Sequence, residues 1–220
     1  MRQSTRSPSM TEPLQAEPAD IASPRQAGKA RSRQSLLRAA KQLFAERGYE
    51  GATMREIAAR AGLSTGAVFA SFADKADLFD AVLQADAEIQ AQAMRKAGAV
   101  RGPTEARLLE LLSAAFTHDL AQAQLLGAGM GAVWSQSLPG EVGDRPVRRP
   151  AVKLIGEALQ DGVRRGELKA DLDAPLIVDM IWDGYLGDCR RAQGAGWTLD
   201  LLTARLQRRL EVLLAAQRAD

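Results

Sequence analysis

The residues with the clearest chemistry lie between positions 25 and 75, where lysine and arginine outnumber aspartate and glutamate by ten to four. This stretch therefore carries a net charge of +6, whereas the whole chain carries only +2 at pH 7. Cations gathered in this way can neutralise phosphate groups, which makes binding to a polyanion strongly dependent on salt. The same excess would also suit a merely solvated helix surface, so its meaning depends on the local fold.

A helix-turn-helix is predicted between residues 53 and 75. Thr53 and Glu56 have the spacing of a capping box, in which each side chain satisfies a free backbone N–H of the other residue, so a helix should begin there. Gly62 ends this helix, because glycine adopts the left-handed conformation at little cost. Ser64 is then the N-cap of a second helix that reaches about residue 70. Two helices joined by so short a turn must cross, an arrangement that places the second helix in a DNA major groove.

The wider pattern, over about residues 33–82, resembles the DNA-binding domain of the TetR family of bacterial transcriptional repressors. The positions that carry the resemblance are Leu36, Leu37, Ala39, Ala40, Leu43, Phe44, Gly48, Tyr49, Thr53, Ile57, Ala58, Ala61, Gly62, Ser64, Gly66, Phe69, Phe72, Lys75 and Leu78. The resemblance implies an all-α fold with an N-terminal three-helix head and a C-terminal helical bundle that binds a ligand and dimerises. It also implies a cytoplasmic, nucleoid-associated homodimer that represses transcription and leaves its operator DNA when a small, largely apolar effector binds.

Three segments are predicted along the chain: a disordered tail over 1–28, the DNA-binding head over 29–75 and the ligand-binding and dimerisation domain over 76–220. Four prolines and no regular periodicity mark the tail. The cations at its end follow DNA as an arm or belong to a solvated tail. Apolar periodicity and capping residues predict further helices over 30–47, 74–97, from Thr104 to about 120, within 121–138, over 150–165, over 173–191 and from Thr198 onward.

The residues expected to meet DNA fall into two groups. Base reading is assigned to the start of the second helix, at Ser64, Thr65, Gly66 and Ala67, and phosphate contact to Thr53, Arg55, the surroundings of Phe69, and Lys75. Free backbone N–H groups at the start of the helix from residue 74 are also expected to meet a phosphate. Two positions depart from the family's common pattern: Phe69 stands where tyrosine is common and Thr65 where lysine is frequent.

An effector pocket is predicted from aromatic and other large side chains of the C-terminal domain, namely Phe116, His118, Met130, Trp134, Trp182 and Tyr185. Each of these residues taken singly also suits core packing. His118, the only histidine, is expected to bond an effector or a neighbouring side chain. Cys189 is expected to be an inert packed thiol rather than an oxidant sensor, because a reactive thiol needs an electropositive, exposed setting.

The dimer interface is assigned by the resemblance to the helices over 150–165 and 173–191. Its candidate residues are Val152, Ile155 and Leu159 on the first helix, and Ile177, Met180, Ile181, Gly184 and Gly187 on the second. The helix over 173–191 has two apolar faces, and either face is a candidate for the interface. The glycines were expected to let another helix approach closely.

Other classes of protein find little support in the composition. With one histidine, one cysteine and no paired carboxylates, the chain is not expected to be an enzyme, to bind a metal or to use a cofactor. The glycines between 127 and 131 match a dinucleotide fingerprint in spacing but lack a preceding strand, which favours close helix packing instead. No apolar run suits a membrane span. The main alternative is an effector-independent DNA-binding architectural or adaptor protein.

Overall fold

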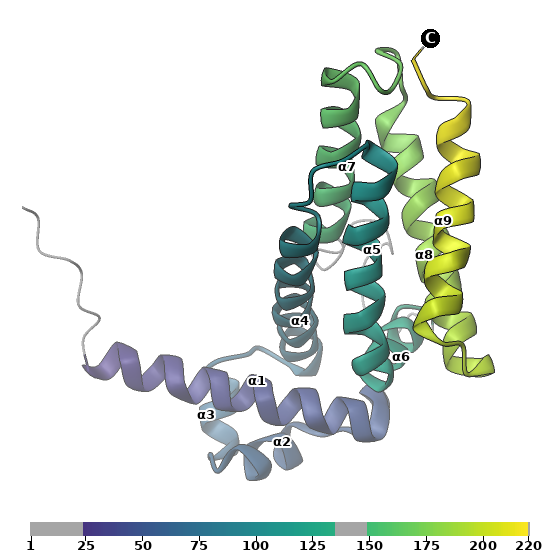
Figure 1. The fold of residues 1–220 in the computed structure, drawn as a ribbon. Helices are drawn as coiled ribbons and strands as arrows, with labels where there is room; N and C mark the ends of the chain where they lie inside the picture. The colour runs from purple at the N-terminus through teal and green to yellow at the C-terminus, as the bar shows by residue number, and fades with distance from the viewer. Residues whose placement is uncertain (1–23, 135–148, 220) are drawn as a thin grey trace, which may run out of the picture.

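The computed structural model describes residues 24–134 and 149–219, and these form nine α-helices (Figure 1). The helices are α1 (Pro24–Gly51), α2 (Met54–Ala61), α3 (Thr65–Phe69), α4 (Lys75–Ala97), α5 (Thr104–Ala121), α6 (Ala123–Trp134), α7 (Arg149–Arg164), α8 (Ala174–Ala195) and α9 (Leu199–Ala215). Within the described residues the only β-type pairing is a single antiparallel bridge between Leu168 and Arg218. The predicted all-α fold is confirmed.

The start and end of α2 and the start of α3 follow the predicted capping signals. The Thr53 side chain accepts a hydrogen bond from the Glu56 N–H, while the Glu56 carboxylate accepts one from the Thr53 N–H, which is a complete capping box. Gly62 ends α2 in the left-handed conformation, with φ 70°. Ser64 accepts a hydrogen bond from the Ala67 N–H and so begins α3. These local bonds fix the tight turn between the two helices.

The head has its own apolar core. Its buried members are Leu36, Ala39, Ala40, Leu43, Phe44, Tyr49, Ala52, Ile57, Ala58, Val68, Phe72, Leu78, Phe79, Val82 and Leu125. The Tyr49 ring lies 4.9 Å from the Phe79 ring and 6.1 Å from the Phe44 ring, centroid to centroid, as expected of a side chain packed against the motif. Gly48, with φ 72°, interrupts the helical backbone of α1 just before this tyrosine.

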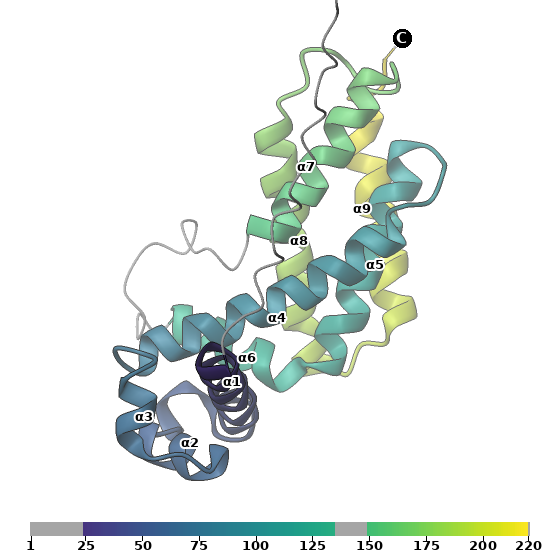
Figure 2. The ribbon, with the colours of Figure 1, turned by 90° about the vertical axis from the view of Figure 1, so that its left-hand side faces the viewer.

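Helix α4 is shared by the head and the C-terminal bundle (Figure 2). Leu78, Phe79 and Val82 near its start belong to the head core, whereas Met94 near its end belongs to the bundle core. At 1.5 Å per residue its 23 residues span about 35 Å. A rotation or shift of α4 would therefore act on both parts of the molecule.

Helix α6 also joins the two parts. Its Leu125 is buried in the head core. A Cβ added to Gly129 would lie 3.4 Å from Leu83 of α4, and one added to Gly127 would lie 3.2 Å from Gln193 of α8. The glycines of this run thus allow close helix packing, as predicted, and the head core extends beyond residue 75.

Three element boundaries differ from the predictions. Residues 24–28 are helical, because a proline is tolerated in the first turn of a helix, where its missing N–H would have no partner; residues 1–23 of the predicted tail lie outside the described residues. Thr104 is not an N-cap: its backbone N–H and hydroxyl both donate to Glu167, a residue far away in the sequence. Helix α8 continues to Ala195, where Gly196 ends it in the left-handed conformation.

The rest of the chain forms the bundle of α5, α7, α8 and α9 around the far end of α4 (Figures 1 and 2). Its buried core includes Leu112 and Phe116 of α5, Ile155 of α7, Tyr185 of α8 and Leu206 of α9. Four leucines of α9 face this core, since Leu202, Leu206, Leu210 and Leu214 are all buried. No helix among the described residues is both long enough and apolar enough to cross a membrane.

Candidate nucleic-acid interface

The start of α3 is the exposed tip of the head. Helices α2 and α3 lie on the side of α1 that faces away from the bundle (Figure 1). Ser64, Thr65 and Gly66 are exposed, while Val68 is fully buried and anchors the other side of the short helix. Of the residues predicted to read bases, Ser64, Thr65 and Gly66 are thus held on a fixed scaffold facing solvent, and Ala67 is partly exposed.

Phe69 presents an apolar ring on the same helix. Its side chain is 53% exposed, although a phenylalanine normally buries most of its surface in a core. The ring lacks the hydroxyl that a tyrosine would offer to a phosphate. It suits contact with a deoxyribose or a thymine methyl group instead.

Much of the positive charge of the head is bound internally. Its ion pairs are Arg47–Glu56 at 2.5 Å, Arg60–Glu46 at 2.7 Å and Lys75–Glu50 at 3.8 Å. Hydrogen bonds from Thr53 and Arg47 lower the pKa of Glu56, and the hydrogen bond from Arg60 lowers that of Glu46. Arg33 lies over the Phe72 ring, 4.3 Å from its centroid, and donates to the Ser71 carbonyl.

The cations left for DNA are fewer than the net charge suggests. Lys29, Arg38 and Arg55 make no hydrogen bond or ion pair with any residue that the structure describes. All three are exposed. Arg55 was predicted to contact phosphate; Arg38 was not singled out, since only the pairing of its neighbours reveals that its charge is uncommitted.

Two of the other residues predicted to contact phosphate already make bonds within the head. The Thr53 hydroxyl donates its proton to the Glu56 carboxylate, with the two oxygens 2.7 Å apart. A phosphate oxygen can only accept a hydrogen bond from this hydroxyl, so it would need the same proton. The Lys75 ammonium donates to the Tyr49 carbonyl at 3.0 Å and lies 4.3 Å from the centroid of the Tyr49 ring. A phosphate contact by either residue would compete with these bonds.

One of the N–H groups that were expected to be free at the start of α4 is already bonded. Asp74 accepts a hydrogen bond from the Asp77 N–H at 2.8 Å, and Asp77 accepts one from the Ala73 N–H at 2.9 Å. Two carboxylates therefore occupy the positive end of the helix dipole and would repel a phosphate. The phosphate contact expected at this helix start stays a prediction, and the Asp77 N–H is no longer available for it.

Three of the predicted effector residues pack on one another in the bundle. The Tyr185 ring stacks on Phe116 with centroids 4.5 Å apart and on Trp182 with centroids 5.0 Å apart. The indole N–H of Trp182 is buried and has no hydrogen-bond partner among the residues that the structure describes. Met130 is partly buried on α6, and the Trp134 side chain lies outside the described residues. An effector role for these residues stays a prediction.

A buried carboxyl that sequence reasoning missed lies beside the stacked rings. Asp119 accepts hydrogen bonds from the Tyr185 hydroxyl at 2.5 Å and from the Gln90 amide at 2.7 Å. Burial raises the pKa of Asp119 to about 6. Its signal in the sequence was an acidic residue at helical spacing from the apolar Leu112, Ala115 and Phe116. Burial also raises the pKa of the neighbouring Cys189 thiol well above its ordinary value, which suits the predicted inert cysteine.

The side chain of His118, the residue before Asp119, contacts α4. Its Nε2 atom lies 3.1 Å from the Asp86 carboxylate, whose other oxygen lies 2.7 Å from the Lys41 ammonium of α1. The hydrogen bond with Asp86 raises the pKa of His118. Of the two partners expected for this histidine, the structure shows the neighbouring side chain.

The predicted dimer residues divide into core and surface. Ile155, Leu159 and Ile181 are fully buried within the single chain and Ile177 nearly so, which leaves their side chains no surface for a partner. The resemblance assigned these helices to an interface, but it could not tell which of their apolar side chains pack inside the chain's own bundle. Val152 is partly buried and Met180 is 45% exposed.

The two glycines predicted in the interface lie under arginines of the same chain. A Cβ added to Gly184 would lie 2.6 Å from the Arg209 Nε atom, and one added to Gly187 would lie 3.2 Å from an Arg191 nitrogen. Both arginines bond Asp188, as does Arg205. The space at Gly184 is thus filled by a side chain of α9 of the same chain, and an interface role for the two glycines stays a prediction.

Comparison with known proteins agrees with this geometry. Residues 36–82 match the model of bacterial regulatory proteins of the tetR family. Over 164 residues the chain is 30% identical to the transcriptional repressor KstR2 of Mycobacterium tuberculosis, a match that covers 72% of this chain and 80% of KstR2. The chain belongs to the tetR family of bacterial regulatory proteins. Family membership thus places the exposed tip of α3 in a helix-turn-helix of known type.

Other relatives match mainly through the head. The chain is 45% identical over 69 residues to the transcriptional repressor AcnR of Corynebacterium glutamicum, a match that covers 31% of this chain and 37% of AcnR. The fatty acid degradation regulator FadR of Bacillus halodurans has a similar structure, with a TM-score of 0.69 at 21% identity over 86% of this chain and 97% of that one. The head is therefore the part most similar in sequence, and the family fold extends through the bundle.

Proposed function

We propose that the protein is a homodimeric transcriptional repressor that binds operator DNA through α3. The observation that carries this proposal is the exposed edge formed by Ser64, Thr65 and Gly66, held rigid by two helix caps and the buried Val68. The family and the repressors named among its relatives support it. Such a protein acts in the cytoplasm, where the nucleoid offers its operator.

Dimerisation follows from the small size of α3. A helix of five residues reaches few base pairs, whereas a two-fold dimer reads two half-sites about one helical turn apart. On α8 the exposed apolar side chains are Leu176, at 53%, and Met180, at 45%. Large apolar groups on one exposed helix face are typical of a surface that a partner covers. We place the partner's contact on this face of α8, with Val152 of α7 at its margin.

The effector is the part of the proposal that concerns the bundle. A small, largely apolar molecule suits the stacked Phe116, Trp182 and Tyr185, with the unpaired Trp182 N–H as a donor for one polar atom of the ligand. Such a ligand weakens DNA binding only if it prefers one arrangement of the head over another. An architectural protein without an effector is the competing function.

Selection of bound sequences from a random DNA pool tests the DNA-binding part. We expect a palindromic site, a stoichiometry of one dimer per site, and a loss of sequence preference in Thr65→Ala. Arg55→Ala should weaken binding to all sequences alike, because a phosphate contact carries no base information. Arg208→Ala is the matched control, since Arg208 is an exposed arginine of α9 outside the head.

Two results would contradict the proposal in different ways. Binding without any sequence preference would favour the architectural alternative. A selected site to which two chains bind independently, one per half-site, would contradict the dimer.

The effector needs a separate experiment. Thermal unfolding against a panel of apolar small molecules should find a stabilising ligand that also lowers operator affinity. A ligand that stabilises the protein without changing operator affinity would rule out the release mechanism.

A further inference from the structure

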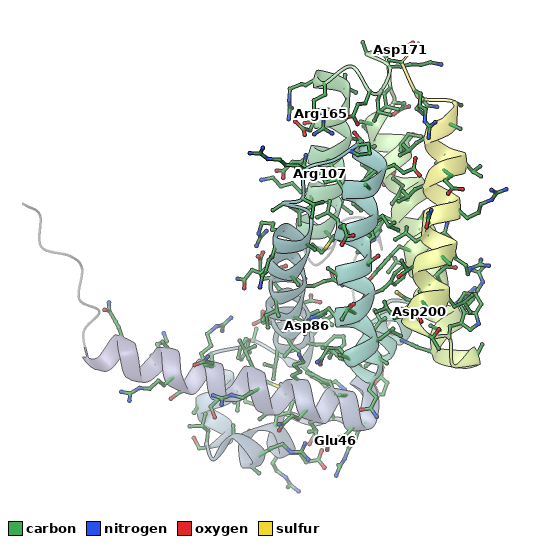
Figure 3. All side chains as sticks on the ribbon, viewed as in Figure 1. Glu46, Asp86, Arg107, Arg165, Asp171 and Asp200 are labelled. Carbon is green, nitrogen blue, oxygen red and sulfur yellow. The ribbon has the colours of Figure 1, made fainter. Side chains whose placement is uncertain are left out.

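A line of polar side chains connects the head to the interior of the bundle. Lys41 on α1 lies 2.7 Å from Oδ1 of Asp86 on α4, and His118 on α5 lies 3.1 Å from Oδ2 of the same carboxylate. Figure 3 shows Asp86 where α4 passes between α1 and α5. One carboxylate thus bonds a cation of the head on one side and the histidine of the bundle on the other.

This carboxylate is held in its charged form. Burial alone would raise the pKa of Asp86, but the hydrogen bonds from His118 and Lys41 outweigh burial and hold it below its ordinary value. The side chains of Asp86 and His118 are only 15% and 12% exposed, and that of Lys41 is 31% exposed. Ion pairs with so little exposure are screened less by salt than surface pairs.

A second cluster of buried polar side chains surrounds Asp119, the next residue of α5. His118 and Asp119 are neighbours on α5, and Asp119 bonds Gln90 of α4 and Tyr185 of α8. The charged groups that act on His118 are Asp86 and Asp119, which raise its pKa, and Lys41, which lowers it. Helix α6, which packs beside α1, contributes no charged residue over 123–134.

We propose that Asp86 is a positioning residue that sets the orientation of the head on the bundle by bonding Lys41 and His118 together, and that protonation of His118 thereby regulates DNA binding. The proposal rests on the proposed DNA-binding function. The physical reason is thermodynamic reciprocity. If a movement of the head changes the Lys41–Asp86 ion pair, it also changes the proton affinity of His118. DNA that binds only one position of the head must therefore change the pKa of His118 as well.

The direction with pH follows from the raised pKa of His118. A pKa that is higher in the folded than in the unfolded state means that the charged histidine stabilises the connection made by Lys41, Asp86 and His118. That contribution is complete below about pH 6.5, the ordinary value, and is lost as the pH rises through the folded-state value. Raising the pH therefore loosens the connection between the head and the bundle.

The single histidine of the chain allows a direct measurement. The NMR signal of its ring reports the pKa of His118 without assignment by mutation. In the free protein we expect this pKa to rise in Lys41→Met, which removes a repelling cation, to stay near the wild-type value in Lys41→Arg, and to fall in Asp86→Asn. These pKa shifts test the coupling of Lys41, Asp86 and His118 in the absence of DNA. An unchanged pKa in both Lys41→Met and Asp86→Asn would overturn the proposal.

The regulatory part is tested with the site obtained by DNA selection. On saturation with this DNA, we expect the pKa of wild-type His118 to shift by about half a unit, equivalent to an about threefold change of operator affinity across the titration. Lys41→Met should lose the shift and Lys41→Arg should keep it. The electric field of the DNA acts on His118 in every variant. The difference between the DNA-induced pKa shifts of the two lysine variants therefore reports the Lys41–Asp86–His118 connection alone.

Three outcomes would overturn the proposal. One is an equal pKa with and without bound DNA. Another is an equal DNA-induced shift in wild type and Lys41→Met, which would make it an effect of the DNA field alone. A wild-type protein that binds no DNA sequence would remove the proposed function, and the regulatory role with it, while the shifts of the free protein would still report whether Lys41, Asp86 and His118 are coupled. Thermal unfolding of each variant controls for loss of fold.

Discussion

The head and the bundle differ in how many polar side chains they bury. In the described part of the head core the buried side chains are apolar apart from the Tyr49 hydroxyl, and the ion pairs lie at the surface. The bundle buries Gln90, Thr104, Asp119 and Asp188. A buried polar group is tolerated only with well-placed partners, so its surroundings admit few alternatives. The core of the head is therefore an apolar scaffold for α3, whereas the core of the bundle also depends on buried polar groups.

The contrast predicts that the head depends on shape. Phe79→Ala should lower the free energy of unfolding by about 4 kcal/mol, because it removes a fully buried ring that packs on Phe44 and Tyr49. Chemical denaturation measures the loss. Phe69→Ala is the matched control: its ring is 53% exposed, so stability should hardly change while DNA binding weakens. Equal losses in the two variants would break the distinction between scaffold and reading surface.

In the bundle the largest polar effect is expected at Asp188. This fully buried carboxylate bonds Arg209 at 2.7 Å, Arg191 at 3.2 Å and Arg205 at 3.4 Å, and it thereby holds α9 on α8. Asp188→Asn should lower the free energy of unfolding by about 3 kcal/mol, since it leaves three arginines without their shared anion. Asp179→Asn removes an exposed carboxylate of the same helix and should have little effect. A neutral result for Asp188→Asn would mean that the bundle, like the head, depends on apolar packing alone.

The buried Asp119 makes a smaller contribution that depends on pH. Its folded-state pKa of about 6 lies above the ordinary 3.8, so the folded chain binds this proton more tightly than the unfolded chain. Stability from this group therefore falls as the pH rises from 3.8 to about 6. Between pH 5 and 7 the loss is about 1.4 kcal/mol, because roughly one pH unit of that interval lies below the folded-state pKa.

Urea denaturation at both pH values compares wild type with Asp119→Asn. The variant should lack this part of the decline, whereas Asp179→Asn should retain it. The informative quantity is the difference in decline between the proteins, because it isolates the contribution of Asp119. A decline of the same size in Asp119→Asn would place the pH response of the bundle elsewhere.

The smallest expected effect separates the free cations of the head from the bonded ones. Arg55→Ala should reduce the slope of log affinity against log salt by about one unit, as expected for one lost phosphate contact. Lys75→Ala should weaken binding to all sequences alike and flatten the slope by about the same amount if its ammonium leaves Tyr49 for a phosphate. Fluorescence anisotropy over a salt series measures both slopes. An unchanged slope in Lys75→Ala, with lowered stability, would make Lys75 a structural cation of the head.

The sequence predicted the head well because the bonds that shape it are local. The capping box of Thr53 and Glu56 spans three residues, as does the cap from Ser64 to Ala67. Such bonds form wherever the residues occur in that order, so their geometry can be anticipated from spacing. The bundle is held by bonds of long sequence separation, such as Tyr185 with Asp119 and Thr104 with Glu167. Thr104 was misread as a cap for this reason.

By itself the sequence determined the all-α fold, the helix-turn-helix and the family, since these depend on periodicity, caps and residue types that act over a few positions. Only the tertiary structure decided which cations remain for DNA, which apolar stripes face the chain's own core, and which carboxyls are buried. Those properties depend on which distant helices meet. Asp86 shows the difference: in the sequence it is one of many aspartates, and in the structure it joins the head to the bundle.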